Sequence, residues 1–257
     1  MVGEVWASMS ALASVWPLIL LRHLVPLRMD FNLFRHINTW IFDLDNTLYP
    51  PEVRLFDQIE EKMRCFVSDF LGVSLEEADR LRAQYWRSHG TTLAGMMEMH
   101  AMPPHDFLRD VHEIDFSVLP YSRRLAQLIA ALPGRKIVYT NGTEPYARRV
   151  LEARGLEQEF ESVYGIEHAN YQPKPRAEAF HKVFAHANVT PHSAAMFEDD
   201  PRNLEVPAGL GMKTVFISPD LIFPDYVDVA HSDLEAFLSH LVEACFSDRF
   251  TGLDNLT

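Results

Sequence analysis

The amino-acid sequence predicts an α/β fold with a parallel sheet that helices cover on both faces. Two observations support this prediction. Short apolar runs rich in β-branched and aromatic residues alternate with longer helical stretches, and a helix is the usual connection between parallel strands. Between positions 50 and 120 the alternation stops and only helical stretches occur, which is too long an interval for an ordinary crossover.

Five short runs have the composition of buried strands. In chain order they are 38–42 (NTWIF), 136–139 (KIVY), 161–165 (ESVYG), 193–197 (SAAMF) and 213–217 (KTVFI). The helices expected around them are 121–132, 144–154, 176–187 and 202–210. Gly134, Gly155 and Gly211 follow three of these helices closely, where glycine commonly ends a helix.

Between the first and second strands, helices are expected at 56–71, 74–88 and 106–113. Ser74 stands two residues before Glu76, which is typical of a helix start because serine caps the first amides and acids favour the first turn. We therefore predict an all-helical cap over 51–120, inserted into a Rossmann-like core made of 29–50 and 121–257. In open α/β sheets, ligands bind at the C-terminal edge, over which such a cap would lie.

Composition restricts the possible partners. The formal charge of −13 over 257 residues argues against binding a nucleic-acid polymer, because phosphate contacts need an excess of Lys and Arg. A small phosphorylated substrate remains compatible, since a divalent cation and one lysine can reverse the local sign. Cys65 and Cys245 match no metal or redox spacing, so we expect buried free thiols in a cytoplasmic protein.

The first 28 residues differ from the rest of the chain. Positions 5–21 are largely apolar but contain three serines and Pro17, so they are marginal for a membrane span. Glu4 precedes this run and Arg22 follows it, the reverse of a signal peptide. We expect 1–28 to be an extension ahead of a true start at Met29, with a weak anchor or signal and a packed helix as alternatives, and no membrane partner.

Two aspartates follow the first strand directly. Asp43 and Asp45 are one residue apart, so alternation would direct both side chains into the crevice at the strand end. One carboxylate can attack phosphorus, and the other can protonate the leaving oxygen and then activate water. Asn46 and Thr47 continue into a turn whose amides can hold phosphate oxygens. A polar strand end or helix cap is the alternative for the aspartates taken alone.

A second polar group follows the second strand, and a lysine stands in a later turn. Thr140 can donate its hydroxyl to a phosphate oxygen, and Gly142 allows close approach of the backbone. We expect Asn141 and Gly142, together with Asn46, to bind substrate. An Asn-Gly turn without function is the alternative. Lys174 stands between two prolines, which limit the direction of its side chain. If its ammonium lay between carboxylates, it would keep them ionised. Taken alone, a lysine in such a turn would be exposed to solvent.

Three acids follow the fourth strand. Glu198, Asp199 and Asp200 would repel one another unless a cation neutralised them, and carboxylates are preferred ligands of Mg²⁺. Asp199 is the first choice as ligand, with Glu198 or Asp200 assisting and Asn203 as a supporting partner. The alternative is an acidic N-terminal cap of the next helix.

These motifs occur in one consistent order, and on them the sequence resembles the haloacid dehalogenase-like superfamily of phosphohydrolases over roughly 38–217, including the helical cap. The resemblance implies a Mg²⁺-dependent reaction and a role for each motif residue. The roles are Asp43 as nucleophile, Asp45 as general acid/base, Thr140 as phosphate anchor, Lys174 as neutralising cation, and Asp199 as a magnesium ligand together with Asp43 and the backbone carbonyl of Asp45.

Within that superfamily, the segments FDLDNTLYP, VYTNGT and FEDDPRNL resemble the pyrimidine 5′-nucleotidase branch. This implies release of phosphate from nucleoside monophosphates such as UMP and CMP, although Asp200 stands where serine is common in the branch. Asp45 argues against dehalogenation, because dehalogenases of the superfamily lack an acid/base at that place. A phosphatase of phosphoglycolate or a sugar phosphate, and a catalytically silent binding protein, are the alternatives.

The cap is expected to select the substrate. Positions 85–93 (YWRSHGTTL) mix aromatic rings with polar groups, and we expect Thr91 and Thr92 to bind substrate there. Core aromatics followed by a helix-ending glycine are the alternative. His105 and His112, on a cap helix, are expected at the surface.

Overall fold

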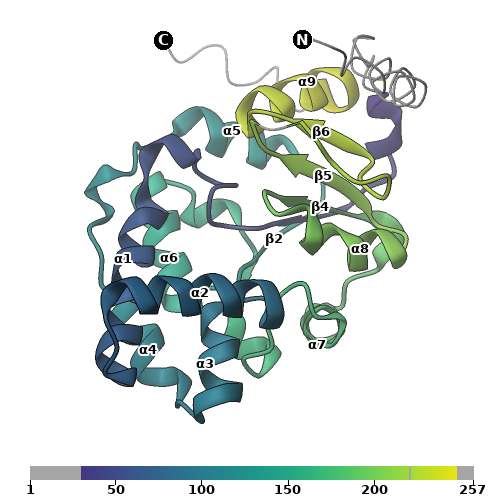
Figure 1. The fold of residues 1–257 in the computed structure, drawn as a ribbon. Coiled ribbons are helices and arrows are strands. Elements are labelled where there is room, and N and C mark those ends of the chain that lie inside the picture. The colour runs from purple at the N-terminus through teal and green to yellow at the C-terminus, as the bar shows by residue number, and fades with distance from the viewer. Residues whose placement is uncertain (1–29, 220, 248–257) are drawn as a thin grey trace, which may run out of the picture. The chain divides into compact units, whose positions relative to one another are not determined.

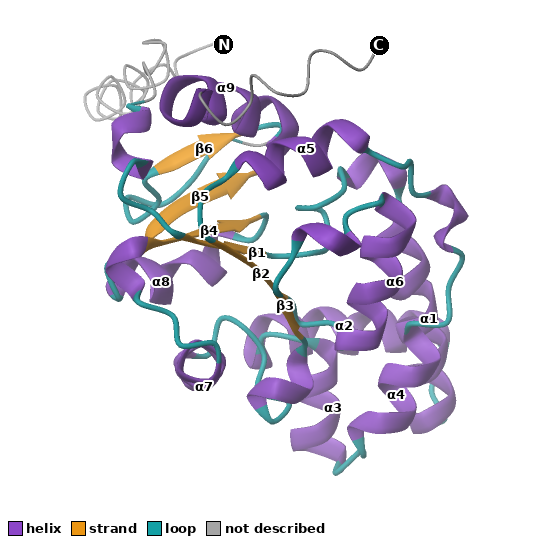
Figure 2. Cartoon of the chain, turned by 180° about the vertical axis from the view of Figure 1, so that it is seen from behind, coloured by secondary structure: helices purple, strands orange, loops and turns teal. Residues whose placement is uncertain are grey.

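The structure is a computed structural model that describes residues 30–219 and 221–247. Six parallel strands form one sheet in the order β3-β2-β1-β4-β5-β6 (Figures 1 and 2). The strands are β1 Thr39–Phe42, β2 Arg135–Tyr139, β3 Ser162–Tyr164, β4 Ala194–Glu198, β5 Lys213–Ile217 and β6 Val229–His231. The predicted α/β fold with a parallel sheet is therefore confirmed.

Helices lie on both faces of this sheet (Figure 2). Helices α5 (Arg123–Ala131) and α9 (Leu234–Phe246) pack on one face, and α7 (Ala177–His186) and α8 (Glu205–Gly209) on the other. All four residues of β1 are buried, as expected for a strand covered on both sides. On the face below α9, the rings of Phe42 and Phe197 stack with centroids 4.5 Å apart. Helix α6 (Glu144–Arg154) follows β2.

Four α-helices lie within 51–120, the segment for which the sequence predicts an all-helical insertion (Figure 1). They are α1 Leu55–Leu71, α2 Leu75–His89, α3 Thr92–His100 and α4 Pro104–Val111. Ser74 caps α2 by accepting a hydrogen bond from the Glu77 amide at 3.2 Å. Helix α3 was not predicted, and its first five residues are all buried.

Other sequence expectations need correction. The expected helix 202–210 is a 3-10 turn, Pro201–Leu204, followed by the short α8, and β6 and α9 were not predicted. Cys65 is exposed, and only Cys245 is partly buried. His105 is exposed as expected, but His112 is buried because its ring stacks on that of Tyr146. The expectations for 1–28 lie outside the described residues, among which no helix has the length and apolar character to cross a bilayer.

The two segments that join the insertion to the sheet meet at Arg154, at the end of α6. Its side chain donates from Nε to the Leu48 carbonyl at 3.1 Å and from Nη1 to the Pro120 carbonyl. The Arg154 carbonyl accepts from the Ser122 amide at 3.0 Å. Arg154 is only 5% exposed, so one buried guanidinium fastens both connections of the insertion.

The order of the strands determines where a ligand can bind. The chain adds β2 and β3 on one side of β1, and β4, β5 and β6 on the other. Where the chain leaves two neighbouring parallel strands toward opposite sides of the sheet, a crevice forms at their carboxyl ends. In this sheet the crevice lies between β1 and β4. Asp43 follows β1 directly, and Glu198 is the last residue of β4. The fold therefore brings the first and last sequence motifs together.

Candidate active site

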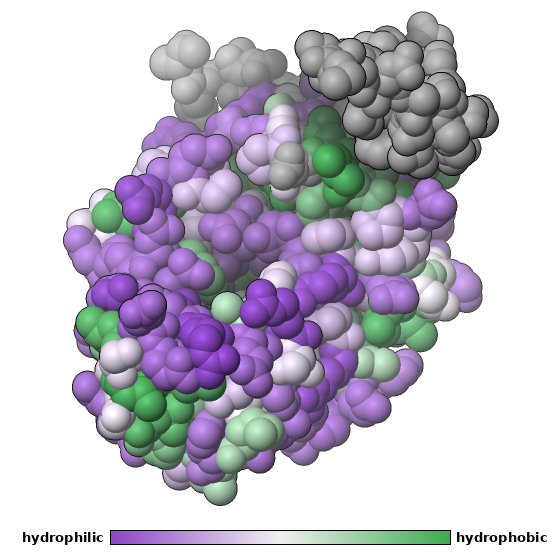
Figure 3. Space-filling model, in the orientation of Figure 1, coloured by the Kyte–Doolittle hydropathy of each residue, from purple (hydrophilic) through white to green (hydrophobic). Residues whose placement is uncertain are grey.

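A cavity of about 830 Å³ lies at this edge of the sheet, below the helices of the insertion. In the space-filling view, the face that carries α2 is hollowed beside the sheet, and hydrophilic side chains surround the hollow (Figure 3). The site residues predicted from the sequence all line this one cavity. They are Asp43, Asp45, Asn46, Thr91, Thr92, Thr140, Asn141, Gly142, Lys174 and Asp199.

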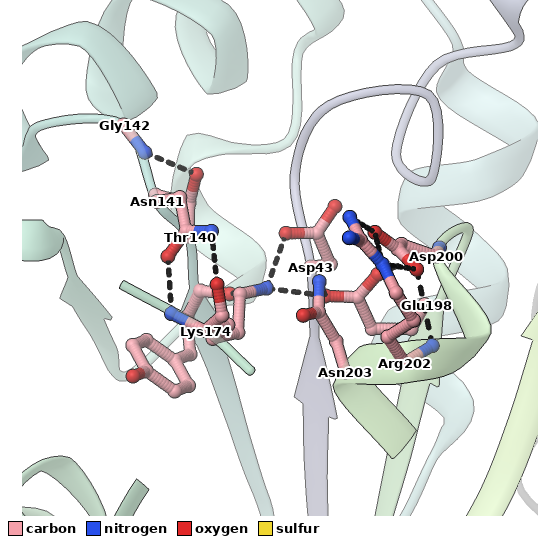
Figure 4. A network of polar contacts seen from close by, with 10 residues as sticks. Asp43, Thr140, Asn141, Gly142, Lys174, Glu198, Asp200, Arg202 and Asn203 are labelled. Atoms are coloured by element: carbon pink, nitrogen blue, oxygen red, sulfur yellow. Dashed lines mark hydrogen bonds and ion pairs between the residues drawn. The ribbon is translucent and has the colours of Figure 1, made fainter. Parts of the chain in front are cut away.

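Lys174 lies at the floor of the cavity and is 1% exposed. Its Nζ donates to Asp43 Oδ1 at 2.6 Å, to Glu198 Oε1 at 2.5 Å and to the Tyr139 carbonyl at 3.1 Å (Figure 4). Burial by itself lowers the pKa of Lys174, but the two carboxylates outweigh it and raise the pKa, so the ammonium stays charged. Burial also raises the pKa of Asp43, against which Lys174 acts.

The polar residues after β2 hold the turn that carries this lysine. Asn141 Oδ1 accepts from the Lys174 amide at 2.8 Å, and its Nδ2 donates to the Lys174 carbonyl at 3.2 Å. The amide of Asn141, expected to bind substrate, is thus engaged with the Lys174 turn. Thr140 Oγ1 accepts from the Gly142 amide at 2.9 Å and keeps its own hydrogen for another acceptor.

Asp45 lies in a different environment from Asp43. The hydroxyls of Tyr49 and Tyr146 both donate to its Oδ1, at 2.6 and 2.5 Å. Burial raises the pKa of Asp45, and the two hydrogen bonds reduce that rise. Burial and the charge of Asp45 also raise the pKa of both tyrosines well above the usual value, so their hydroxyls remain donors. Neither tyrosine was predicted as a site residue.

Three carboxylates offer oxygens to a metal ion. Ligand atoms of Asp43, Glu198 and Asp199 all lie within 4.8 Å of one another. Burial and the charges of Glu198 and Asp43 raise the pKa of Asp199 well above its usual value, and a cation bound among these carboxylates would offset their mutual repulsion. Hard oxygen donors in an electron-rich cluster fit Mg²⁺. The residues present are therefore compatible with the expected cation.

Glu198 has little capacity left for a metal. Its Oε1 accepts from Lys174 and, at 2.8 Å, from Nδ2 of Asn203, and its Oε2 accepts from the Asp200 amide at 3.0 Å (Figure 4). Burial raises its pKa to about 7. Asp43 and Asp199 remain as the carboxylates available to a cation. Glu198 and Asn203 instead hold the Lys174 ammonium and the loop after β4.

Asp200 does not assist in the cluster, contrary to one of the sequence alternatives. Its carboxylate accepts from the backbone and side chain of Arg202, both at 3.0 Å. The Arg202 guanidinium in turn lies 3.8 Å from the ring centroid of Trp86 in the insertion. Asp200 thus orients an arginine that joins the sheet side of the cavity to α2.

The cap segment 85–93 has features of both sequence alternatives, since some of its residues line the cavity and others belong to the core of the cap. Tyr85 is 3% exposed and its hydroxyl pairs with His100 Nε2 at 2.6 Å inside the cap, whereas Trp86 lines the cavity. Thr91 Oγ1 accepts from the Ala94 amide at 3.1 Å and so caps α3. Thr92 is buried, although it lines the cavity too.

The backbone conformation favours asparagine at position 46, in addition to the place of this residue at the cavity. Its φ is 56°, a left-handed conformation that asparagine adopts more readily than most residues.

Comparisons with known proteins agree with this architecture. Phosphate metabolism protein 8 of Saccharomyces cerevisiae is 24% identical over 194 residues, a match that covers 67% of this chain and 59% of that protein. The HAD phosphatase from Thermococcus onnurineus superposes with a TM-score of 0.54 at 18% identity, over 80% of this chain and 98% of the other.

L-2-haloacid dehalogenase from Xanthobacter autotrophicus, with chloropropionic acid covalently bound, gives a TM-score of 0.53 at 14% identity, and the magnesium-bound HAD-hydrolase YfnB from Bacillus subtilis gives 0.52 at 16%. Each match covers 80% of this chain and 98% of the other. At these identities the likeness shows the fold, which phosphatases and dehalogenases share. The family model described as haloacid dehalogenase-like hydrolase matches residues 37–211, a span that includes every motif described above. The chain therefore belongs to the haloacid dehalogenase-like hydrolases.

Proposed function

We propose that the chain is a magnesium-dependent phosphomonoesterase that hydrolyses a small phosphorylated metabolite through an aspartyl phosphate on Asp43. The pair of aspartates after β1 carries this proposal, because their surroundings differ. Asp43 lies 2.6 Å from the Lys174 ammonium, which favours its ionised form, whereas the donors to Asp45 among the described residues are neutral hydroxyls. Two carboxyl groups with such different surroundings suit the roles of a nucleophile and a general acid.

The chain's own residues supply the steps. An oxygen of Asp43 bonds to phosphorus while the ester bond breaks, and Asp45 gives its proton to the leaving oxygen. Asp45 then takes a proton from water, whose oxygen displaces Asp43 from phosphorus. Thr140 donates its hydroxyl to a phosphate oxygen, and Lys174 offsets charge on the phosphoryl group. A magnesium ion held by Asp43, Asp199 and the Asp45 carbonyl would supply further charge neutralisation when bound.

As the substrate we propose a nucleoside 5′-monophosphate of the pyrimidine type. The cavity of about 830 Å³ is much larger than a phosphate group and lies in the range of sites for small organic ligands. The Trp86 ring is half exposed and lines it, as do Arg82 and Arg87. A planar base and a ribose suit such a wall. Phosphoglycolate or a sugar phosphate is the alternative substrate.

The test is phosphate release with Mg²⁺ from UMP, CMP, dTMP, AMP, GMP, phosphoglycolate and glucose 6-phosphate. Halide release from 2-chloropropionate is measured beside it, because dehalogenases share the fold. Asp43→Asn serves as the blank, and Asp57→Asn, at an exposed aspartate of α1, as the matched control. We expect phosphate release that Asp43→Asn abolishes, that a chelator stops and that added Mg²⁺ restores.

Different outcomes of this experiment test the substrate, the reaction and the nucleophile separately. Preference for UMP and CMP would support the substrate, whereas preference for a non-nucleotide would keep the reaction and discard the nucleotide. Halide release without phosphate release would replace the reaction itself. Turnover by Asp43→Asn near the wild-type rate would remove Asp43 from the role of nucleophile.

A further inference from the structure

We propose that Tyr49 and Tyr146 are positioning residues that determine which oxygen of Asp45 exchanges the proton with the substrate. This inference rests on the phosphatase function proposed above. It concerns two buried tyrosines that do not line the cavity and that the reaction scheme does not otherwise use.

The two hydroxyls converge on a single oxygen. Both donate to Asp45 Oδ1, Tyr49 at 2.6 Å and Tyr146 at 2.5 Å. A carboxylate oxygen has two lone pairs in its plane, so two donors occupy Oδ1 fully. No described residue donates to Oδ2, and Asp45 lines the cavity. A proton on Oδ1 would displace one tyrosine, whereas a proton on Oδ2 leaves both bonds intact.

The tyrosines are themselves held in place. Tyr49 lies in the turn after β1 and Tyr146 in the first turn of α6, and they are 1% and 2% exposed. The Tyr146 ring stacks on His112 with centroids 4.3 Å apart and an interplanar angle of 10°. On another side it lies against Gly142, where a Cβ atom would come within 2.7 Å of Tyr146 Cδ1. The hydroxyls therefore have little freedom to leave Asp45.

This arrangement matters most for substrates with poor leaving groups. When Asp43 bonds to phosphorus and the ester bond breaks, the leaving oxygen takes the proton from Asp45 Oδ2. In the second step, water gives a proton back to Oδ2 while its oxygen bonds to phosphorus and the bond to Asp43 breaks. An alkoxide leaves poorly without that proton, whereas 4-nitrophenolate is a stable anion and leaves without it. A misplaced Oδ2 should therefore slow the hydrolysis of alkyl phosphate esters more than that of 4-nitrophenyl phosphate.

The experiment compares kcat/KM for two esters, because this parameter includes phosphoryl transfer to Asp43 but not the later hydrolysis. The esters are the best alkyl phosphate of the substrate panel and 4-nitrophenyl phosphate. Tyr49→Phe, Tyr146→Phe and the double variant keep the rings and remove only the hydroxyls. Tyr85→Phe is the matched control, since it loses a buried hydroxyl that pairs with His100 inside the cap. Thermal unfolding verifies that each variant is folded.

We expect each hydroxyl deletion to reduce kcat/KM for the alkyl ester about tenfold to a hundredfold, less than the loss of the whole general acid, which is worth about 10²–10⁴-fold, with less than about a threefold change for 4-nitrophenyl phosphate. Equal losses on both esters, or no loss on either, would overturn the inference while the phosphatase function stands. A wild-type protein that hydrolyses neither ester would overturn the proposed function, and the inference with it.

Discussion

His112 should make the stability of this protein depend on pH below neutrality. Its ring is 9% exposed, stacks on Tyr146, and has Nδ1 3.2 Å from the Thr143 hydroxyl. Burial, with Arg149 nearby, lowers the pKa of His112 to about 4. In the unfolded chain a histidine titrates near its ordinary pKa of about 6.5. Between these two values the unfolded chain binds a proton that the folded protein does not, so acid favours unfolding.

The size of this effect follows from the two pKa values. Their difference of about 2.5 corresponds to about 3 kcal/mol, a large share of a typical unfolding free energy of about 5–15 kcal/mol. His112→Phe keeps an aromatic ring against Tyr146 and cannot titrate. Urea unfolding of wild type and variant is repeated between pH 7.5 and pH 4. The difference between their free energies of unfolding isolates the contribution of His112, because the other titrating groups contribute equally to both proteins.

We expect the wild-type free energy of unfolding, relative to that of His112→Phe, to fall by about 3 kcal/mol as the pH falls from 7.5 to 4. The fall should begin near pH 6.5 and end near pH 4. His105→Asn, at the exposed histidine of α4, is the control. Parallel pH profiles for wild type and His112→Phe would refute the reasoning, because they would show that His112 titrates alike in the folded and unfolded chains.

Two further substitutions test the buried cations. Lys174→Met leaves Asp43 and Glu198 without their common partner, so we expect a loss of about 3–5 kcal/mol in urea unfolding and a fall in kcat of at least about a hundredfold; wild-type stability would contradict the ion pairing. Arg154→Met leaves the buried carbonyls of Leu48 and Pro120 without donors, so we expect a loss of about 2–5 kcal/mol. Arg148→Met, at an exposed arginine of the same helix, should change stability by less than about 1 kcal/mol, and an equal loss in both variants would refute the role of Arg154.

The sheet and the cavity residues could be predicted because their signals are local. A central strand of a parallel sheet is buried on both faces, so β1 and β4 read as continuous apolar runs that end in acids. All carboxyl ends of parallel strands meet at one edge, so Asp43 and Asp199 had to converge. The order of the motifs along the chain was enough to place them together.

The elements that were missed lacked such a signal or had a weak one. Helix α3 is buried over its first five residues, so no polar face recurs with the helical period. Strand β6 has three residues, too few for a pattern. For α9 a signal existed, because Asp233 caps the helix and Leu234, Phe237 and Leu238 recur at helical spacing.

The two tyrosines on Asp45 show where prediction from one sequence ends. Tyr49 stands only four residues after Asp45, and the turn between them is closed by a bond of 2.9 Å from the Leu48 amide to the Leu44 carbonyl, so this partner was within reach of a local argument. Tyr146 is 101 residues from Asp45 and stands in an amphipathic helix, where a tyrosine reads as an ordinary core residue. Only the packing of α6 against the loop after β1 turns its hydroxyl into a partner of the carboxylate. Chemical type and order along the chain indicate which groups react, whereas the groups that hold them in place depend on contacts between distant segments.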